Sequence, residues 1–112
     1  APDYYSVIKE PMWLTEIIKK IKNGSYSKLS QYVYDMNLIW SNAIKYNTEN
    51  SIIGILAKCG EYKFKSELAK LTATEQDEHL YKLKKYSKQI GFYTQYLQKE
   101  LDHVPVKYDV KP

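Results

Sequence analysis

The chain has 112 residues, enough for one hydrophobic core and too few for two. Hydrophobic residues make up 44% and charged residues 27%, which excludes a disordered or collagen-like chain. Its single cysteine excludes an internal disulfide and cannot by itself build a zinc site. No apolar run approaches the roughly 18 residues of a membrane span, and no signal peptide opens the chain. We therefore expect a soluble, intracellular protein.

The net charge is +4, and all 17 basic residues are lysine. Tyrosine is also abundant, with 12 residues. The two together are typical of nucleic-acid-binding domains, because cations bind phosphates and aromatic rings stack on bases. The absence of arginine weakens that interpretation, since arginine makes the bidentate contacts to guanine and phosphate. An AT-rich genome, which favours Lys, Ile, Tyr and Asn, explains the composition as well.

Apolar residues recur at helical spacing and predict an all-α protein. A first helix is expected over residues 14–21, ending at Asn23 and Gly24, which tolerate the left-handed conformation. Ser27 is expected to cap a second helix that ends near Asn47. The inward face of this second helix has apolar residues in steps of four and three: Leu29, Val33, Met36, Trp40 and Ala43.

Two more helices follow. The third is predicted from about Ser51 to Leu71, where Gly54 and Gly60 each weaken it by about 1 kcal/mol unless close packing requires them. The fourth is predicted from Thr74, whose hydroxyl can cap it. It has an apolar seam of near-heptad spacing, made of Leu80, Leu83, Ile90, Leu97 and Leu101. Two polar residues are expected to interrupt this seam: Ser87 and Thr94.

Signatures of catalysis are absent from the sequence, so we expect no enzyme, no cofactor and no metal site. The four glycines are too scattered for a phosphate-binding loop. Asp3 and Asp35 are interpreted as a turn cap and as part of a polar helix face, not as a catalytic pair. Cys59 is interpreted as a buried thiol. His79 and His103 lack partners at metal-ligand spacing and are interpreted as surface residues.

Four lysines form a basic run on the fourth helix: Lys82, Lys84, Lys85 and Lys88. The run lies in residues 51–112, which carry +3 of the net charge. It could contact DNA weakly or bind an acidic partner. A solvated outer helix face is the simpler interpretation.

Four segments of residues 1–71 occur at separations typical of one family: PDYYSVIKEPMWL, IIKKIKNGSY, DMNLIWSNAIKYN and NSII. Together they resemble the bromodomain, the module that reads acetyl-lysine. Within that family, DMNLIWSNAIKYN and a later TEQDEHL are similar to the second bromodomain of the largest subunit of the general transcription factor TFIID. The resemblance implies a left-handed four-helix bundle that reads acetylated lysine, on histone tails in chromatin or transcription regulation, in the nucleus. Residues 72–112 would be a helical extension and tail.

The resemblance also implies the binding residues. Asn47 would donate a hydrogen bond to the acetyl carbonyl, and Tyr4 would hold a water that bridges to the same oxygen. Ile53 would be the gatekeeper at the start of the third helix. The second helix would line the pocket with three further residues: Ile39, Ala43 and Tyr46. In such a site an unmodified ammonium would lose its hydration and gain no counter-ion, whereas the neutral acetyl amide loses little.

The sequence departs from the family pattern at two places. Trp13 stands where the family has an acidic residue, which removes the expected cap of the helix over residues 14–21. The chain also begins within the family's first loop, so the family's first helix and its Trp-Pro-Phe shelf have no counterpart in this sequence. Without that helix, large apolar faces would be exposed. We expect residues 74–101 to replace it, by folding back or by exchange with a second copy in a homodimer.

Alternatives remain open at this stage. The third and fourth helices could instead form one extended projection. A function of another class would be a helical oligomerisation or scaffold module with a vestigial acetyl-lysine pocket. Direct DNA binding through residues 82–88 is a third possibility, and it is compatible with acetyl-lysine reading.

Overall fold

The computed structural model describes residues 3–72 and 83–102, with the side chains of residues 86–101 in the second range. These two ranges contain five helices and no strand: α1 (Tyr4–Val7), α2 (Leu14–Lys22), α3 (Leu29–Asn47), α4 (Ile52–Leu71) and α5 (Leu83–Asp102). The prediction of an all-α fold is confirmed. None of the helices in this part of the chain has the length and apolar character needed to cross a membrane.

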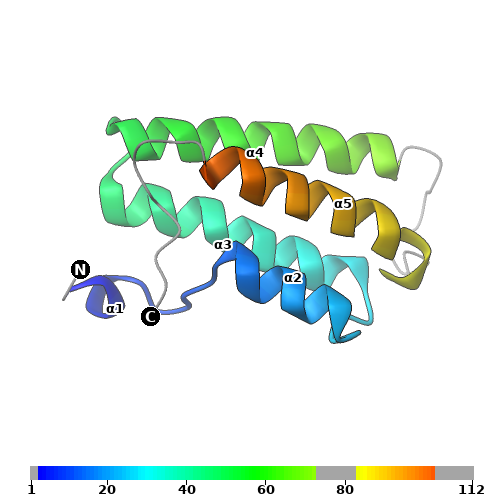
Figure 1. Ribbon diagram of the computed structural model, residues 1–112. Helices are drawn as coiled ribbons and strands as arrows, with labels where there is room; N and C mark the ends of the chain where they lie inside the picture. Colours follow the sequence, from blue (N-terminus) through cyan, green and yellow to red (C-terminus); the bar gives the residue numbers. More distant parts are fainter. Residues whose placement is uncertain (1–2, 73–82, 103–112) are drawn as a thin grey trace.

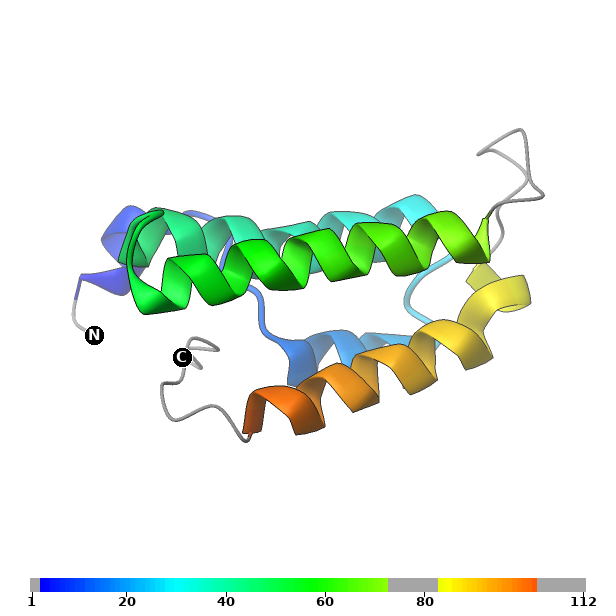
Figure 2. The ribbon, with the colours of Figure 1, turned by 90° about the horizontal axis from the view of Figure 1, so that it is seen from above.

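The four longer helices form two antiparallel pairs. α3 packs along α4, and α5 packs against α2 (Figure 1). Viewed from above, the pair of α3 and α4 faces the pair of α2 and α5 (Figure 2). α5 thus folds back onto the bundle within the same chain. Folding back is one of the two arrangements expected for residues 74–101, the other being exchange with a second copy. The alternative of one extended projection is wrong.

The ends of α2 follow from local chemistry. The N–H of Asn23 donates to the Lys19 carbonyl at 2.9 Å, and Gly24 has a φ of 68°, so the predicted end of this helix is confirmed. At the other end, Trp13 precedes α2 and makes no side-chain capping bond. Its carbonyl accepts from the Ile17 N–H at 3.2 Å.

The predicted cap of α3 is wrong by one residue, because Lys28 and not Ser27 precedes the helix. The Gln31 side chain satisfies the backbone donors there. Its Oε1 accepts from the N–H groups of Ser27 at 2.7 Å and Lys28 at 3.1 Å. A glutamine three residues into the helix reaches back and performs this part of the capping.

α4 begins as predicted, since the Oγ of Ser51 accepts from the Gly54 N–H at 3.0 Å. Both glycines of this helix have a packing reason. A Cβ on Gly54 would overlap the Thr48 carbonyl oxygen, and one on Gly60 would overlap the Trp40 ring. Close packing therefore requires both of them.

The core is built mostly from the predicted apolar faces. Its buried residues include Leu14, Ile17, Leu29, Met36, Trp40, Ala43, Ala57, Phe64, Ile90 and Leu97. The expectation that Thr94 interrupts the seam of α5 is wrong, since this residue is fully buried. Its Oγ1 donates to the Ile90 carbonyl at 2.6 Å and accepts from the Tyr32 hydroxyl at 2.9 Å. A threonine fits in the core because both of these hydrogen bonds are made.

Two further expectations are wrong. Asp35 does not lie on a solvated face: it is 6% exposed and lies 2.6 Å from both the Lys20 ammonium and the Tyr26 hydroxyl. Burial and this carboxylate raise the pKa of Tyr26 above its usual value. Cys59 is exposed rather than buried, in an open groove between α4 and α5.

Candidate functional site

The predicted site residues come from three elements that meet at one end of the bundle. α1 packs against α3, and the C-terminal end of α3 lies beside the N-terminal end of α4 (Figure 1). The buried residues Tyr4 and Ile8 at this end lie outside the main core. The end of the bundle is thus covered by the segment that precedes α2.

Tyr4 and Tyr46 form an aromatic pair. Their ring centroids are 4.9 Å apart with an interplanar angle of 63°, and Tyr4 is only 4% exposed. The Tyr46 hydroxyl donates to Oδ1 of Asp3 at 2.8 Å. This hydrogen bond to a carboxylate raises the pKa of Tyr46, so its neutral phenol is favoured. The α1 segment and α3 are therefore joined by both a ring contact and a hydrogen bond.

Asn47 is the last residue of α3 and is half-buried. Its Nδ2 donates to the carbonyl oxygen of Ala43 at 3.0 Å, which holds the side chain against its own helix. An asparagine amide nitrogen carries two N–H groups, so a second donor remains for a ligand oxygen. Tyr46 lies beside Asn47 at the end of α3, whereas Ala43 and Ile39, one and two turns before Asn47, belong to the main core.

The loop between α3 and α4 is tightly held. Thr48 has a φ of 68° and a ψ of 154°, a conformation that only glycine adopts readily. Its carbonyl accepts from the Ser51 Oγ at 2.8 Å. Glu49 pairs with Lys58 at 2.6 Å, and this cation lowers the pKa of Glu49. The loop thus leads directly to Ile53, which is half-buried against the core.

The structure brings Tyr4 together with Tyr46, and Asn47 together with Ala43. Ile53 lies beyond the loop that follows Asn47, and Ile39 lies beneath the site. This end of the bundle thus carries one amide donor, an aromatic pair and the aliphatic side chain of Ala43. In the two described ranges, no group of three His, Cys, Asp or Glu residues is placed to hold a metal ion.

Sequence reasoning missed several contacts that shape this end of the bundle. Asp3 is the hydrogen-bond partner of Tyr46, in addition to its position before α1. The Nδ2 of Asn42, a buried residue, donates to the Glu10 carbonyl at 2.9 Å and ties the first loop to α3. A signal existed for Asn42, since it is a polar residue between the apolar positions of α3.

Several predicted features lie outside the described residues: Thr74, His79, His103 and Lys82. The same holds for the side chains of Lys84 and Lys85. Of the basic run, only Lys88 has a described side chain, and it is exposed. The proposed DNA contact of this run therefore remains a prediction.

The family model described as Bromodomain matches residues 1–59. The SAGA complex subunit Spt7 of Schizosaccharomyces pombe is 52% identical over 48 residues, or 43% of this chain and 5% of that protein. The SWR1 complex bromodomain subunit bdf1 of the same organism is 37% identical over 75 residues, or 67% of this chain and 13% of that protein.

A third relative is the nucleosome-remodeling factor subunit NURF301 of Drosophila melanogaster. It is 44% identical over 61 residues, which are 54% of this chain and 2% of that protein. The chain thus spans only a small part of the curated relatives that it matches. Since the family match extends over more than half of its residues, this chain belongs to the bromodomain family.

Proposed function

We propose that this protein reads acetylated lysine in chromatin or transcription regulation, as a binding module and not as an enzyme. The observation that carries the proposal is the Asn47 amide, which is held by the Ala43 carbonyl and keeps a second donor beside the paired rings of Tyr4 and Tyr46. The names of the relatives, which are subunits of the SAGA, SWR1 and nucleosome-remodeling complexes, support a role in chromatin.

Acetylation makes such a site selective. It converts a hydrated ammonium into a neutral amide, whose oxygen accepts one hydrogen bond and whose methyl group packs on apolar surface. In the proposal, Asn47 donates to that oxygen and Tyr4 holds a bridging water. Ile53, Tyr46, Ala43 and, more deeply, Ile39 form the walls. An unmodified lysine would have to give up its hydration near Asn47, while the nearby Asp3 carboxylate already accepts a hydrogen bond from the Tyr46 hydroxyl.

Finer statements belong to the same proposal. The ligand would be an acetylated histone tail and the protein would be nuclear. The bromodomain portion would be residues 1–71, with residues 72–112 as an extension. The likeness to the second bromodomain of the largest TFIID subunit, a weak DNA contact through residues 82–88 and a homodimer formed by helix exchange remain predictions, the last of which light scattering would test.

The central test replaces the amide. Asn47→Ala removes the donor, and Asn47→Asp replaces it with an acceptor that repels the acetyl oxygen. Each is expected to weaken binding of an acetylated histone-tail peptide by about tenfold or more, because an unpaired buried carbonyl costs about 1–3 kcal/mol. Calorimetry with acetylated and unmodified peptides would measure this.

Asn50→Ala is the matched control, since Asn50 is exposed in the loop that follows and should leave binding unchanged. Circular dichroism would verify that all variants keep their helices. Equal affinity for acetylated and unmodified peptides would contradict the proposal and favour the scaffold alternative. Undiminished binding by both Asn47 variants would refute the pocket assignment.

A further inference from the structure

A pocket lies at the other end of the bundle, among α3, α4 and α5. It is lined by the aromatic residues Tyr32, Phe64 and Tyr93, with Leu68 and Leu71 as apolar neighbours, and has a volume of about 60 Å³. Tyr32 precedes Asn47 by 15 residues on one helix, so about 22 Å separate the pocket from the acetyl-lysine site. The proposed function does not use it.

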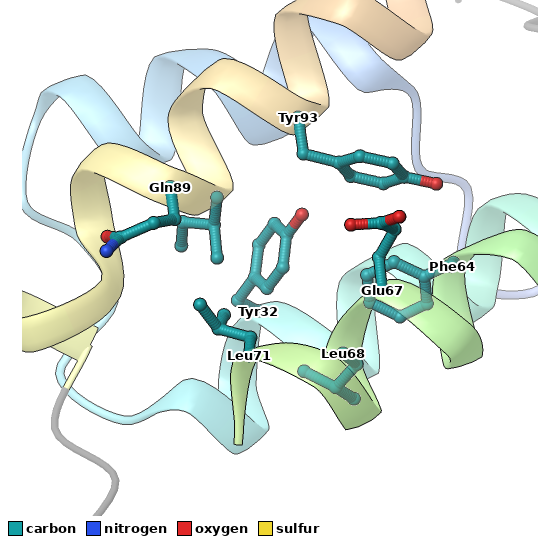
Figure 3. A pocket seen from close by; sticks show the side chains of 8 residues that line it. Tyr32, Phe64, Glu67, Leu68, Leu71, Gln89 and Tyr93 are labelled. Carbon is teal, nitrogen blue, oxygen red and sulfur yellow. The ribbon is translucent and has the colours of Figure 1, made fainter. Parts of the chain in front are cut away.

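Its three rings line the pocket and contact one another in a row. The centroids of Tyr32 and Phe64 are 5.9 Å apart at 68°, and those of Phe64 and Tyr93 are 6.2 Å apart at 32° (Figure 3). The Tyr32 hydroxyl is engaged by Thr94, so Tyr32 contributes its ring rather than a hydrogen-bonding group to the pocket. Faces of aromatic rings carry partial negative charge and attract cations.

One carboxylate also lines the pocket, as do Gln89 and Ile90. Glu67 of α4 lines the same pocket as the three rings (Figure 3). Burial and the charge of Glu67 raise the pKa of Tyr93 to about 12, so its phenol stays neutral beside this carboxylate. Lys70 lies 3.6 Å from Glu67, but both side chains are more than half exposed. Such a surface pair is worth little, so a ligand cation could displace Lys70.

We propose that this aromatic pocket binds an alkylated ammonium group, with Tyr32, Phe64 and Tyr93 in contact with its methyl groups and Glu67 balancing its charge. Glu67 would repel an anion, and a neutral apolar ligand would make no use of it. An unmodified ammonium is strongly hydrated, whereas methyl groups reduce that hydration and pack on the rings. The pocket volume of about 60 Å³ exceeds the roughly 10–15 Å³ needed for one water and is below the roughly 150 Å³ of a cavity that holds benzene, so the pocket admits only a small part of a ligand.

The ligand could be a methylated lysine side chain or a free quaternary ammonium compound. Amide signals of the isotope-labelled full chain would be followed by NMR during titration with choline. A second titration would use 3,3-dimethylbutanol, in which carbon replaces the charged nitrogen. A third would use a short peptide that contains trimethyl-lysine. We expect saturable shifts at Glu67 and Tyr93 with both cations, and binding of the neutral alcohol about tenfold weaker than that of choline.

Variants separate the two parts of the pocket. Glu67→Gln should weaken choline binding about fivefold, whereas Glu61→Gln on the same helix should not. Tyr93→Leu should abolish choline binding, whereas Tyr93→Phe should retain it. The control Tyr62→Leu, at an exposed tyrosine, should also retain choline binding. If Tyr93→Leu fails to fold, the Glu67→Gln variant still tests the proposal, because Glu67 is exposed and its substitution leaves the core intact.

Equal binding of choline and its neutral isostere, wild-type binding by Glu67→Gln, or no shift with either cation would overturn the proposal. Tighter binding of the peptide than of choline would identify a side chain as the source, and the reverse order a free ligand. Either order supports the shared chemistry. Binding of acetylated peptide should be unchanged in the Glu67→Gln variant, so the two sites are tested independently.

Discussion

Gly54 and Gly60 let α4 approach its neighbours more closely than any side chain would permit. Gly60 admits the Trp40 ring, which is completely buried in the core. Gly54 admits the Thr48 carbonyl and so allows the loop after Asn47 to lie on the first turn of α4. These two glycines therefore lower the helix propensity of α4 but permit close contact with the Thr48 carbonyl and the Trp40 ring.

Substitution of Gly60 by alanine should destabilise the protein by about 1–2 kcal/mol, because overpacking against a rigid indole exceeds the gain in helix propensity. Gly91→Ala on α5 is the matched control. Its added Cβ would meet only Ile21 at 4.0 Å, so it should stabilise the protein by up to about 1 kcal/mol. Urea unfolding measures both, and a stabilised Gly60→Ala variant would show that Trp40 can move.

The carboxylate of Asp3 positions Tyr46 in the proposed site. Asp3→Ala should bring the pKa of Tyr46 back down toward its ordinary value and weaken acetyl-peptide binding about threefold, since the ring loses one anchor. Glu10→Ala is the control. The Glu10 carboxylate accepts from the Tyr34 hydroxyl and raises the pKa of Tyr34, and this pair lies away from the site. Spectrophotometric titration of tyrosine and calorimetry follow the two effects. Equal losses of affinity in both variants would exclude a specific role for Asp3.

At the scale of elements, α5 is attached to the bundle by apolar packing and by a buried hydrogen bond between two hydroxyls. Tyr86, Ile90 and Leu97 are buried, and Thr94 accepts the Tyr32 hydroxyl of α3. α5 thus covers α2 and contacts α3. The hydrogen bond between the Tyr32 and Thr94 hydroxyls helps to specify its register.

Thr94→Val should cost about 1–3 kcal/mol of unfolding free energy, because it leaves the buried Tyr32 hydroxyl without its acceptor. Tyr32→Phe should cost about 1 kcal/mol. The double variant should lose less than the sum of the two, since no unpaired hydroxyl remains. Urea unfolding of the four proteins completes this cycle. Strictly additive losses would mean that the two hydroxyls do not interact.

At the scale of the whole molecule, buried tyrosines contribute to the core. Tyr26, Tyr32 and Tyr93 lie in or against the core, and burial raises the pKa of each, in Tyr93 to about 12. In the unfolded chain these phenols would ionise near pH 10. Their contribution to stability is therefore complete below about pH 10 and is lost as pH rises from there toward the folded-state values.

Above about pH 10 the protein should accordingly unfold cooperatively as these tyrosines ionise. Circular dichroism would report the loss of helix, and absorbance near 295 nm would report the formation of phenolate. The two should change together for the buried residues. Full ionisation of all tyrosines with the helical signal intact would contradict the burial of these rings.

Much of the fold was predictable because its signals are local. Helical periodicity and capping residues predicted α2, α3 and α4 to within one or two residues. The family resemblance predicted a site at the end of α3, where Tyr4 and Tyr46 are in contact. The partners of these residues, Asp3 for Tyr46 and the Glu10 carbonyl for Asn42, lie more than 30 residues away in the chain and have no local signal.

The sequence by itself thus determined the helical class, the basic and arginine-free composition, and the amide and aromatic residues of the proposed site. Only the tertiary structure decided that Thr94 and Asp35 are buried, that Cys59 is exposed and that α5 lies on α2. It also created the aromatic pocket, whose lining comes from α3, α4 and α5. The physical reason is the same in each case: periodicity identifies the faces of a helix, but burial depends on which other helix covers each face.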